Sequence, residues 1–475
     1  MKEKQNFIFK KFARVITVLA VCFFMAMAVP FTSAADVISG NLADGTPYRV
    51  HKPEPWNGTI ILDLDGYSVS GAKLDWMMKY GYAIGGTIRT GYDFRQAVDR
   101  LVEVRSIFTD EFGLPTRTIA WGGSRGGFVG RLSMEFEPDI FDGALVTAGG
   151  GSGEIAVLNS KLDSLFVLKI LVNPDSPMQI VGVPNNPAAT GAETSALNDL
   201  VMLADSTPLG QARLALAAAV EQFAPWTVRG TEEPAPDDYD AQYEQLIMSI
   251  GFAINYVFAN PIVVRAPIEE LAGGVVSWNH GINYTSMLAR SGRKDFVKAM
   301  YKKAGASLMA DLRTLAKAPR IYADPDAVAI AEKLMSYTGE IEGPVMNVKN
   351  TGDVVDPPSC DTAYAKTIRR AGNQKLLRNA WVHSPAHGGV NALELITGFV
   401  MLMDRLDTGK WGLTSPCRMN KLAEELAAES PEIFADDEYR FVVQVPIQPL
   451  RTWDVNDWDT YDPEMDNQKC KKYHD

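Results

Sequence analysis

The sequence predicts an α/β protein with a mostly parallel central sheet, flanking helices and a large helical cap. Short apolar runs alternate with helix-like segments over residues 45–150, at the spacing that implies parallel strand pairing. Residues 151–340 are rich in Ala, Leu and Met and contain helical runs with few strand candidates. Strand-like runs return at residues 343–350 and 375–383, so the sheet is expected to resume after this insertion.

The first 35 residues have the composition of a secretory signal peptide. Their apolar run, VITVLAVCFFMAMAV, is short for a membrane-spanning helix and is followed by the small residues of FTSAAD. This pattern predicts cleavage near Ala34 or Ala35, a secreted or periplasmic protein, and no membrane association after cleavage. The basic residues that precede the apolar run are Lys2, Lys4, Lys10, Lys11 and Arg14.

The first core segment reads as alternating strands and helices. The predicted strands are TIILDL (59–64), YAIGGTI, TIAWGG and FDGALVTAG. GAKLDWMMKYGY has helical spacing, and residues 94–113 place apolar side chains on one broad helical face that is stopped by Gly113 and Pro115. GFVGRLSMEFEP is predicted to form the helix after TIAWGG.

After the insertion, GPVMNVKN and KLLRNAWVH are predicted strands, and residues 391–406 have the pattern of a closing amphipathic helix. FVVQVPI, closer to the C-terminus, reads as an edge strand that precedes an irregular acidic segment. The predicted parts of the chain are the signal peptide (1–35), a first core part (36–150), the helical cap (151–340), a second core part (341–431) and a C-terminal strand with an acidic tail (432–475).

Composition excludes several classes of protein. An apolar content of 46% and a charged content of 22% are ordinary for a globular chain of 475 residues. The net charge is −12, and loss of five basic residues and one acidic residue with the signal peptide makes it about −16. Such a charge argues against binding to nucleic acid or to anionic membranes. The mature chain keeps Cys360, Cys417 and Cys470, which allow one disulfide but form no Cys/His cluster for structural zinc.

A glycine-flanked serine is the candidate nucleophile. Ser124 lies in Gly122-Gly123-Ser124-Arg125-Gly126, a G-x-S-x-G pattern between a predicted strand and a predicted helix. Such a turn needs an unfavourable backbone angle, and we expect Gly122 and Gly126 to remove the clashes that it creates. The other two glycines of the stretch, Gly123 and Gly127, are expected to permit close packing or close approach of the backbone.

A serine nucleophile needs a base, and the chain has five histidines. His387 is favoured because it lies in a Gly-containing loop after the last predicted core strand, whereas His383 still adjoins that strand. Their spacing of four residues could suggest a metal site, but Pro385 between them argues against a helix that presents both rings. No metal is therefore expected at this site.

The acid that orients the histidine is expected in NVKNTGDVVDPP. Asp353 follows a predicted strand within a turn and is favoured, with Asp356 as the alternative. Glu394, on the closing helix, could support the histidine loop or cap its own helix. The aspartates of the acidic tail do not match a calcium-binding loop, because Trp458 occupies a ligand position, so a solvated tail is favoured.

These residues give the chain its resemblance to the α/β-hydrolases. It resembles that family over residues 45–150 and 340–406, with the serine, acid and histidine in the family's order. The resemblance implies Ser124, Asp353 and His387 as a catalytic triad and a cap over the active site. It also implies an oxyanion hole built from the backbone N–H groups of Arg125 and Tyr67, with Gly66 and Ser68 as alternatives to Tyr67.

The combined expectation is an exported serine hydrolase that cleaves a carboxylic ester through an acyl-enzyme, without a cofactor. A peptidase or amidase that acts on short peptides with the same triad is the first alternative. A non-catalytic ligand-binding protein on the same fold is the second. The expected partner is a small-molecule ester or short peptide, and the sequence does not indicate an oligomeric state.

Overall fold

The computed structural model describes residues 36–252, 260–434 and 437–451. The predicted signal peptide, its cleavage site, Cys470 and the aspartates of the acidic tail lie outside these residues. Within them the strands form one sheet in the order β1-β2-β4-β3-β5-β6-β7-β8-β9. The strands are β1 (Asp36–Asn41), β2 (Pro47–Lys52), β3 (Thr59–Asp63), β4 (Ala83–Gly86), β5 (Arg117–Gly123), β6 (Gly143–Thr147), β7 (Val345–Gly352), β8 (Leu377–Pro385) and β9 (Phe441–Val442).

The central strands of the sheet run parallel, and its edges are antiparallel. β3 pairs in parallel with β4 and β5, and the parallel pairing continues through β6, β7 and β8. This arrangement confirms the predicted α/β class. β1 and β2, which the sequence pattern did not identify, form an antiparallel pair at one edge. At the other edge FVVQVPI was predicted to be a strand, but only Phe441–Val442 pairs with β8.

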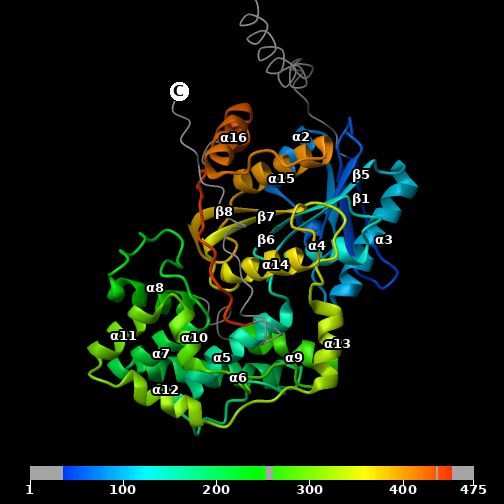
Figure 1. The fold of residues 1–475 in the computed structure, drawn as a ribbon. Coiled ribbons are helices and arrows are strands. Elements are labelled where there is room, and N and C mark those ends of the chain that lie inside the picture. Colours follow the sequence, from blue (N-terminus) through cyan, green and yellow to red (C-terminus); the bar gives the residue numbers. More distant parts are fainter. Residues whose placement is uncertain (1–35, 253–259, 435–436, 452–475) are drawn as a thin grey trace, which may run out of the picture.

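Helices cover both faces of the sheet because its side chains alternate between two apolar cores. Ile60 and Leu62 of β3 pack on the face of α3 and α4, whereas Ile61 packs on the face of α2, α15 and α16. Figure 1 shows α2, α15 and α16 above the sheet and α4 and α14 below it. These helices are α2 (Gly71–Lys79), α3 (Phe94–Phe112), α4 (Arg125–Phe136), α14 (Ser359–Arg370), α15 (Ala392–Thr408) and α16 (Pro416–Glu429), with the short α17 (Pro431–Phe434) and the 3-10 helix η1 (Gly66–Ser68).

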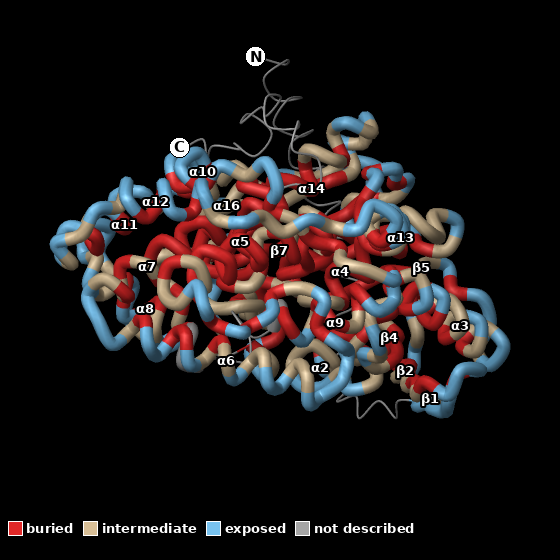
Figure 2. Tube along the Cα trace, turned by 90° about the horizontal axis from the view of Figure 1, so that it is seen from below, coloured by how far each residue is buried: buried red, intermediate tan, exposed pale blue. Residues whose placement is uncertain are grey.

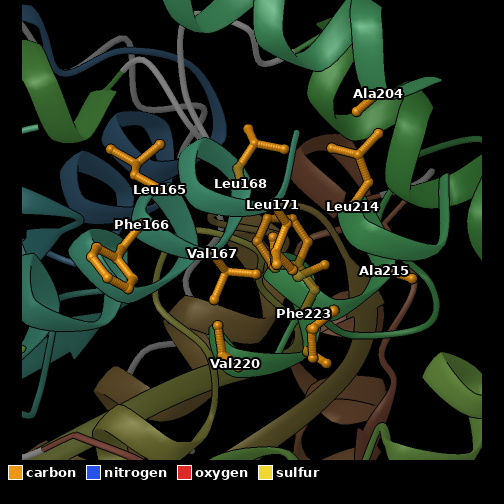
Figure 3. Close-up of a cluster of buried hydrophobic side chains, with 14 of the residues drawn as sticks. Leu165, Phe166, Val167, Leu168, Leu171, Ala204, Leu214, Ala215, Val220 and Phe223 are labelled. Atoms are coloured by element: carbon orange, nitrogen blue, oxygen red, sulfur yellow. The ribbon is translucent and has the colours of Figure 1, made fainter. Parts of the chain in front are cut away.

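The cap is a helical layer inserted between β6 and β7, and it has its own apolar core. α5 and α7 lie at the centre of that core, which Figure 3 shows around Leu168, Leu214 and Phe223. Figure 2 shows buried backbone running from β7 and α4 into α5, with exposed segments at the outer helices. No helix in the described ranges is long and apolar enough to cross a membrane. The helices are α5 (Glu154–Val172), α6 (Pro187–Asp205), α7 (Pro208–Val220), α8 (Tyr239–Phe252), α9 (Asn260–Ala272), α10 (Tyr284–Arg290), α11 (Lys294–Lys303), α12 (Leu308–Lys317) and α13 (Pro325–Met335).

The C-terminal segment connects the sheet edge to the cap, as the red trace in Figure 1 shows. After β9 it extends to the cap, where the side-chain amide of Gln222 donates to the Gln448 carbonyl at 2.8 Å. Arg451 then forms a buried ion pair with Asp163 of α5, with 3.1 Å between Nε and Oδ2. The segment therefore helps to fix the cap relative to the core.

Candidate active site

The structure brings three predicted site residues together at the carboxyl edge of the sheet. Ser124 follows β5, Asp353 follows β7 and His387 follows β8. These strands are parallel, so their carboxyl ends lie along one edge, and loops that are far apart in sequence meet there.

Ser124 lies at a strained turn between β5 and α4. Its φ of 55° and ψ of −124° are uncommon for a residue with a side chain. The turn is held by its backbone, because the N–H of Ser124 donates to the Thr147 carbonyl at 3.0 Å. A Cβ atom on Gly122 would lie 2.1 Å from the Gly126 carbonyl oxygen, so the predicted need for glycine at position 122 is confirmed.

Gly126 was predicted to relieve a clash at the turn, and this prediction was wrong. A Cβ atom there would make only ordinary contacts, with Asp63 Oδ1 nearest at 3.4 Å. The close approach instead involves Gly127, where a Cβ atom would lie 2.8 Å from the Thr147 carbonyl oxygen. Gly127 therefore allows α4 to pack against the end of β6.

Ser124, His387 and Asp353 form a continuous hydrogen-bonded chain. His387 Nε2 lies 2.9 Å from Ser124 Oγ, and His387 Nδ1 lies 2.9 Å from Asp353 Oδ1. Such a chain allows the imidazole to accept the serine proton while the carboxylate stabilises the resulting charge. Burial would lower the pKa of His387, but the adjacent Asp353 carboxylate, with Asp356 farther away, raises it above its usual value.

Asp353 is fully buried and is held ionised by its neighbours. Burial alone would raise its pKa, but His387 and Lys349 together keep the pKa well below its usual range. Its Oδ1 also accepts from the backbone N–H groups of Val355 at 2.9 Å and Asp356 at 3.0 Å. Asp356, the alternative acid, therefore supports Asp353 through its backbone rather than contacting His387 through its side chain.

A buried lysine that the sequence analysis did not identify lies behind this carboxylate. Lys349 of β7 is completely buried, and its Nζ donates to Asp353 Oδ2 at 2.8 Å. Its Nζ also lies 4.0 Å from Asp361 Oδ2, and Asp361 pairs with Arg131 at 2.6 Å. Charges of alternating sign thus extend from α4 to the histidine. The signal in the sequence was a lysine inside the otherwise apolar run GPVMNVKN.

The two histidines of the loop have different surroundings. Two hydrogen bonds fix the loop of His387. Asn350 Nδ2 donates to the Ala386 carbonyl at 2.7 Å, and Arg229 of the cap donates to the Gly388 carbonyl at 2.7 Å. His383 is on β8, where its Nε2 lies 2.8 Å from Glu233 Oε2, and its half-exposed ring packs against Trp226. His383 therefore does not contact Ser124 or Asp353.

The predicted oxyanion donors differ in their availability. Arg125 is the first residue of α4, where backbone N–H groups lack acceptors within the helix, and it adjoins Ser124. The N–H of Tyr67 instead donates to the Thr87 carbonyl at 3.0 Å, and that of Ser68 donates to the Asp65 carbonyl at 3.2 Å. The structure thus contradicts the prediction for Tyr67 and the alternative Ser68, and Gly66 remains.

A cavity of about 330 Å³ opens beside Ser124 and His387. Its size lies at the lower end of the range for small-molecule sites. Tyr92, Phe94 and Phe128 supply aromatic surface, and α5 and α9 supply Val157, Leu158 and Val264. Its lining also includes the basic side chains of Arg89, Arg125 and Lys161 and the acidic side chains of Glu154 and Asp356.

The remaining candidates have structural roles. Glu394 caps α15, where it forms a reciprocal capping box with Asn391, and it pairs with Arg440 at 3.1 Å. Cys360 is a buried free thiol, and Cys417 is disulfide-bonded. Among the described residues, no group of His, Cys, Asp and Glu side chains could hold a metal ion.

Comparison with known proteins places the chain in a family. It is 32% identical over 414 residues to an o-phthalyl amidase from Xanthobacter agilis. The matched region covers 81% of this chain and 90% of that protein. The chain belongs to the α/β-hydrolase superfamily. No family model matches it. Within the superfamily it is a hydrolase of the esterase, amidase or peptidase type.

Two solved structures from this superfamily are similar to the chain at low sequence identity. Feruloyl esterase B from Aspergillus oryzae is 12% identical with a TM-score of 0.37, over 81% of this chain and 84% of that one. An esterase from Aspergillus oryzae is 13% identical with a TM-score of 0.37, over 78% of this chain and 79% of that one.

Proposed function

We propose that this protein is a serine hydrolase that cleaves an amide of an aromatic carboxylic acid through an acyl-enzyme. The observation that carries the proposal is the chain of hydrogen bonds from Ser124 through His387 to Asp353, which faces the cavity. Each distance in that chain is 2.9 Å, within the range for a nucleophile activated by an adjacent base.

In the first half of the reaction, Ser124 Oγ attacks the substrate carbonyl carbon and forms a C–O bond, while His387 Nε2 takes the serine proton. The carbonyl oxygen becomes an oxyanion, which the backbone N–H of Arg125 at the start of α4 stabilises. Collapse of this intermediate breaks the C–N bond, and His387 gives its proton to the departing amine.

In the second half, water attacks the acyl-enzyme while His387 takes the proton from that water. The ester bond to Ser124 breaks, the carboxylic acid leaves, and Ser124 regains its proton from His387. Asp353 stays ionised throughout and stabilises the positive charge on His387, which agrees with a carboxylate whose pKa is held low.

The choice of an amide rests on the relative, and the choice of an aromatic acid rests on the cavity. The sequence alone favoured an ester, but 32% identity to an o-phthalyl amidase now favours the amide. The rings of Phe94 and Phe128 lie 5.4 Å apart and line the cavity beside Ser124, so they offer stacking surface to an aromatic acyl group. An ester of the same acid is expected to react as well, because its leaving group is easier to expel.

Covalent labelling tests the nucleophile. A fluorophosphonate probe should label the wild-type protein but not the Ser124→Ala variant, whereas Ser70→Ala, which changes an exposed serine, should be labelled normally. Benzoyl p-nitroanilide and benzoyl p-nitrophenyl ester then report amide and ester cleavage. Failure of labelling and turnover in folded wild-type protein would instead support the non-catalytic binding protein.

We also propose that the protein is exported, since its N-terminus has the pattern of a signal peptide. Mass spectrometry of the mature protein should give an N-terminus near Ala34 or Ala35. A mature chain that still begins at Met1 would contradict this proposal.

A further inference from the structure

The two oxygens of the Asp353 carboxylate have different sets of partners. Oδ1 accepts from the backbone N–H groups of Val355 and Asp356 and lies 2.9 Å from His387 Nδ1. Oδ2 lies 3.1 Å from the same ring nitrogen and accepts from Nζ of Lys349 at 2.8 Å. The terminal torsion of an aspartate side chain has only broad preferences, so partners on both oxygens are needed to fix the plane of the carboxylate. Lys349 supplies this restraint at Oδ2.

Lys349 is itself attached to a rigid part of the fold. It lies on β7, between β6 and β8 in the sheet, and pairs there with Trp381 of β8. Its side chain is completely buried, and its Nζ also lies 4.0 Å from Asp361 Oδ2 on α14. Asp353, in contrast, is in the loop that follows β7. The lysine therefore connects the loop of the catalytic acid to the central sheet.

The charge of Lys349 matters most before the reaction begins. Among the described residues, the ion pairs of Asp353 are with Lys349 and His387. His387 must be neutral to accept the serine proton, so at that stage Lys349 supplies the positive charge beside the buried carboxylate. A buried ion pair contributes little net stability compared with apolar side chains of the same size, so stability alone does not explain a cation in the middle of a buried strand. The position instead indicates a role in the reaction.

We propose that Lys349 is a positioning residue for the reaction: its ammonium group fixes the plane of the Asp353 carboxylate and supplies the charge that balances it while His387 is neutral. It acts through Asp353, because its ion pairs are with Asp353 and Asp361 and it is not among the residues that line the cavity beside Ser124. This inference rests on the proposed function and assigns a role in it to a side chain outside the triad.

Other charged groups also surround the triad, and their effect has to be separated from that of Lys349. Burial and the charge of Lys349 lower the pKa of His387, whereas Asp353 and, farther away, Asp356 raise it above its usual value. Charged or titratable side chains on the surrounding elements are Arg89, Arg125 and Arg131, Glu154 and Lys161 on α5, Arg229 and Glu233 of the cap, Asp361 on α14 and His383 on β8. A test of Lys349 therefore has to change this one charge and keep the others.

The pH dependence of kcat/KM for benzoyl p-nitroanilide provides this test. Activity requires neutral His387, so kcat/KM rises with pH through the pKa of this residue in the free enzyme. Loss of the lysine charge in Lys349→Met should raise that pKa and move the rise to higher pH by about 1 pH unit. The high-pH limit of kcat/KM should also fall by about 10- to 100-fold, because the carboxylate plane is no longer fixed. A rise at the wild-type pH, with or without a loss of rate, would overturn the inference.

Asn347→Leu is the matched control for a purely structural effect. Asn347 is buried on the same face of β7, two residues before Lys349, and its side chain donates to Asp361 rather than to Asp353. Because Asn347 is neutral, the variant should lose stability and leave the pH of the rise unchanged. A movement as large as that in Lys349→Met would assign the effect to disruption of β7 and would also overturn the inference.

Two further variants separate the charge of Lys349 from its hydrogen bond. Lys349→Gln keeps an N–H donor but not the charge, so the rise should move as in Lys349→Met with a smaller loss of rate. Lys349→Arg keeps the charge, so the rise should return towards its wild-type pH. A Lys349→Gln variant with the wild-type pH dependence would refute the role of the charge.

Covalent labelling makes the test independent of folding yield. Only folded molecules react with the fluorophosphonate probe, so the pseudo-first-order rate constant of labelling does not depend on which fraction of a destabilised variant is folded. Its pH dependence should move in the same way as that of kcat/KM, and Lys349→Gln replaces Lys349→Met if the latter yields no folded protein. Unlabelled wild-type protein would refute the proposed function, whereas labelled variants that share the wild-type pH dependence would refute only the role of Lys349.

Discussion

The two walls of the cavity differ in how their charges are satisfied. On the wall at the ends of β5, β7 and β8, Asp353 accepts hydrogen bonds from His387, Lys349 and two backbone N–H groups. At the starts of α4 and α5, which form a second wall, Arg125 has no ion pair and Glu154 has no hydrogen bond within the described residues. A satisfied network is rigid and prepared for chemistry, whereas an unsatisfied one gains energy only when a ligand completes it.

The largest expected effect comes from the acid of the first wall. Asp353→Asn keeps the size of the side chain but removes the charge that orients and stabilises His387, so kcat should fall by about 10³- to 10⁴-fold. The measurement is steady-state hydrolysis of benzoyl p-nitroanilide, with circular dichroism to verify folding. Asp356→Asn is the matched comparison and should lose much less, because Asp356 contacts Asp353 only through its backbone. An equal loss in both variants would mean that the two acids share the role.

Removal of the buried lysine should affect stability more than any surface change. Lys349→Met leaves Asp353 and Asp361 without the cation between them, and such losses cost about 3–5 kcal/mol. Urea denaturation at pH 7 measures the free energy of unfolding. Combining Lys349→Met with Asp353→Asn should cost less than the sum of the single changes. Each single variant leaves one charged partner of this ion pair behind, whereas the double variant removes both. Strict additivity would show that the pair is not coupled.

Removal of the charge at Glu154 should have the opposite effect on stability: it should stabilise the folded protein. The pKa of Glu154 rises from 4.5 to about 7 on folding, so ionisation opposes the folded state as the pH increases through this interval. Glu154→Gln removes that penalty. The variant should therefore exceed wild type by up to about 3 kcal/mol at pH 8 and by little at pH 4.5. Glu111→Gln, at an exposed position of α3, should differ little from wild type at either pH.

Local patterns were sufficient to predict Ser124, Asp353 and His387 but not Glu154. Ser124, Asp353 and His387 each follow a strand in a glycine- or turn-rich segment, so strand ends and turn residues indicated them, and parallel pairing brought them together. Glu154 follows a strand too, but its importance depends on which side chains α4 and the β7–α14 loop place beside it. That information is not local, and no short pattern carries it.

The oxyanion donor and the antiparallel edge were missed for a similar reason. The N–H of Tyr67 donates to Thr87, which follows β4, and the sequence does not show that β4 lies between β2 and β3. Lys349 was missed because a charged residue inside a predicted strand is usually placed toward solvent, whereas here two aspartates from later segments neutralise it. The hydrogen bond of Tyr67 and the burial of Lys349 both depend on contacts between distant parts of the chain.

The smallest expected effect tests whether the cap influences the histidine loop. Arg229 is exposed, and its guanidinium donates to the Gly388 carbonyl at 2.7 Å, next to His387. Because exposed contacts contribute about 1 kcal/mol or less, Arg229→Ala should lower kcat/KM for benzoyl p-nitroanilide by only about 2- to 5-fold. Arg229→Lys, which can still donate to a carbonyl, should recover part of the loss. A loss well above this range would mean that Arg229 contributes more than this exposed contact. A loss within this range that Arg229→Lys partly restores would place the effect on the position of the loop that carries His387.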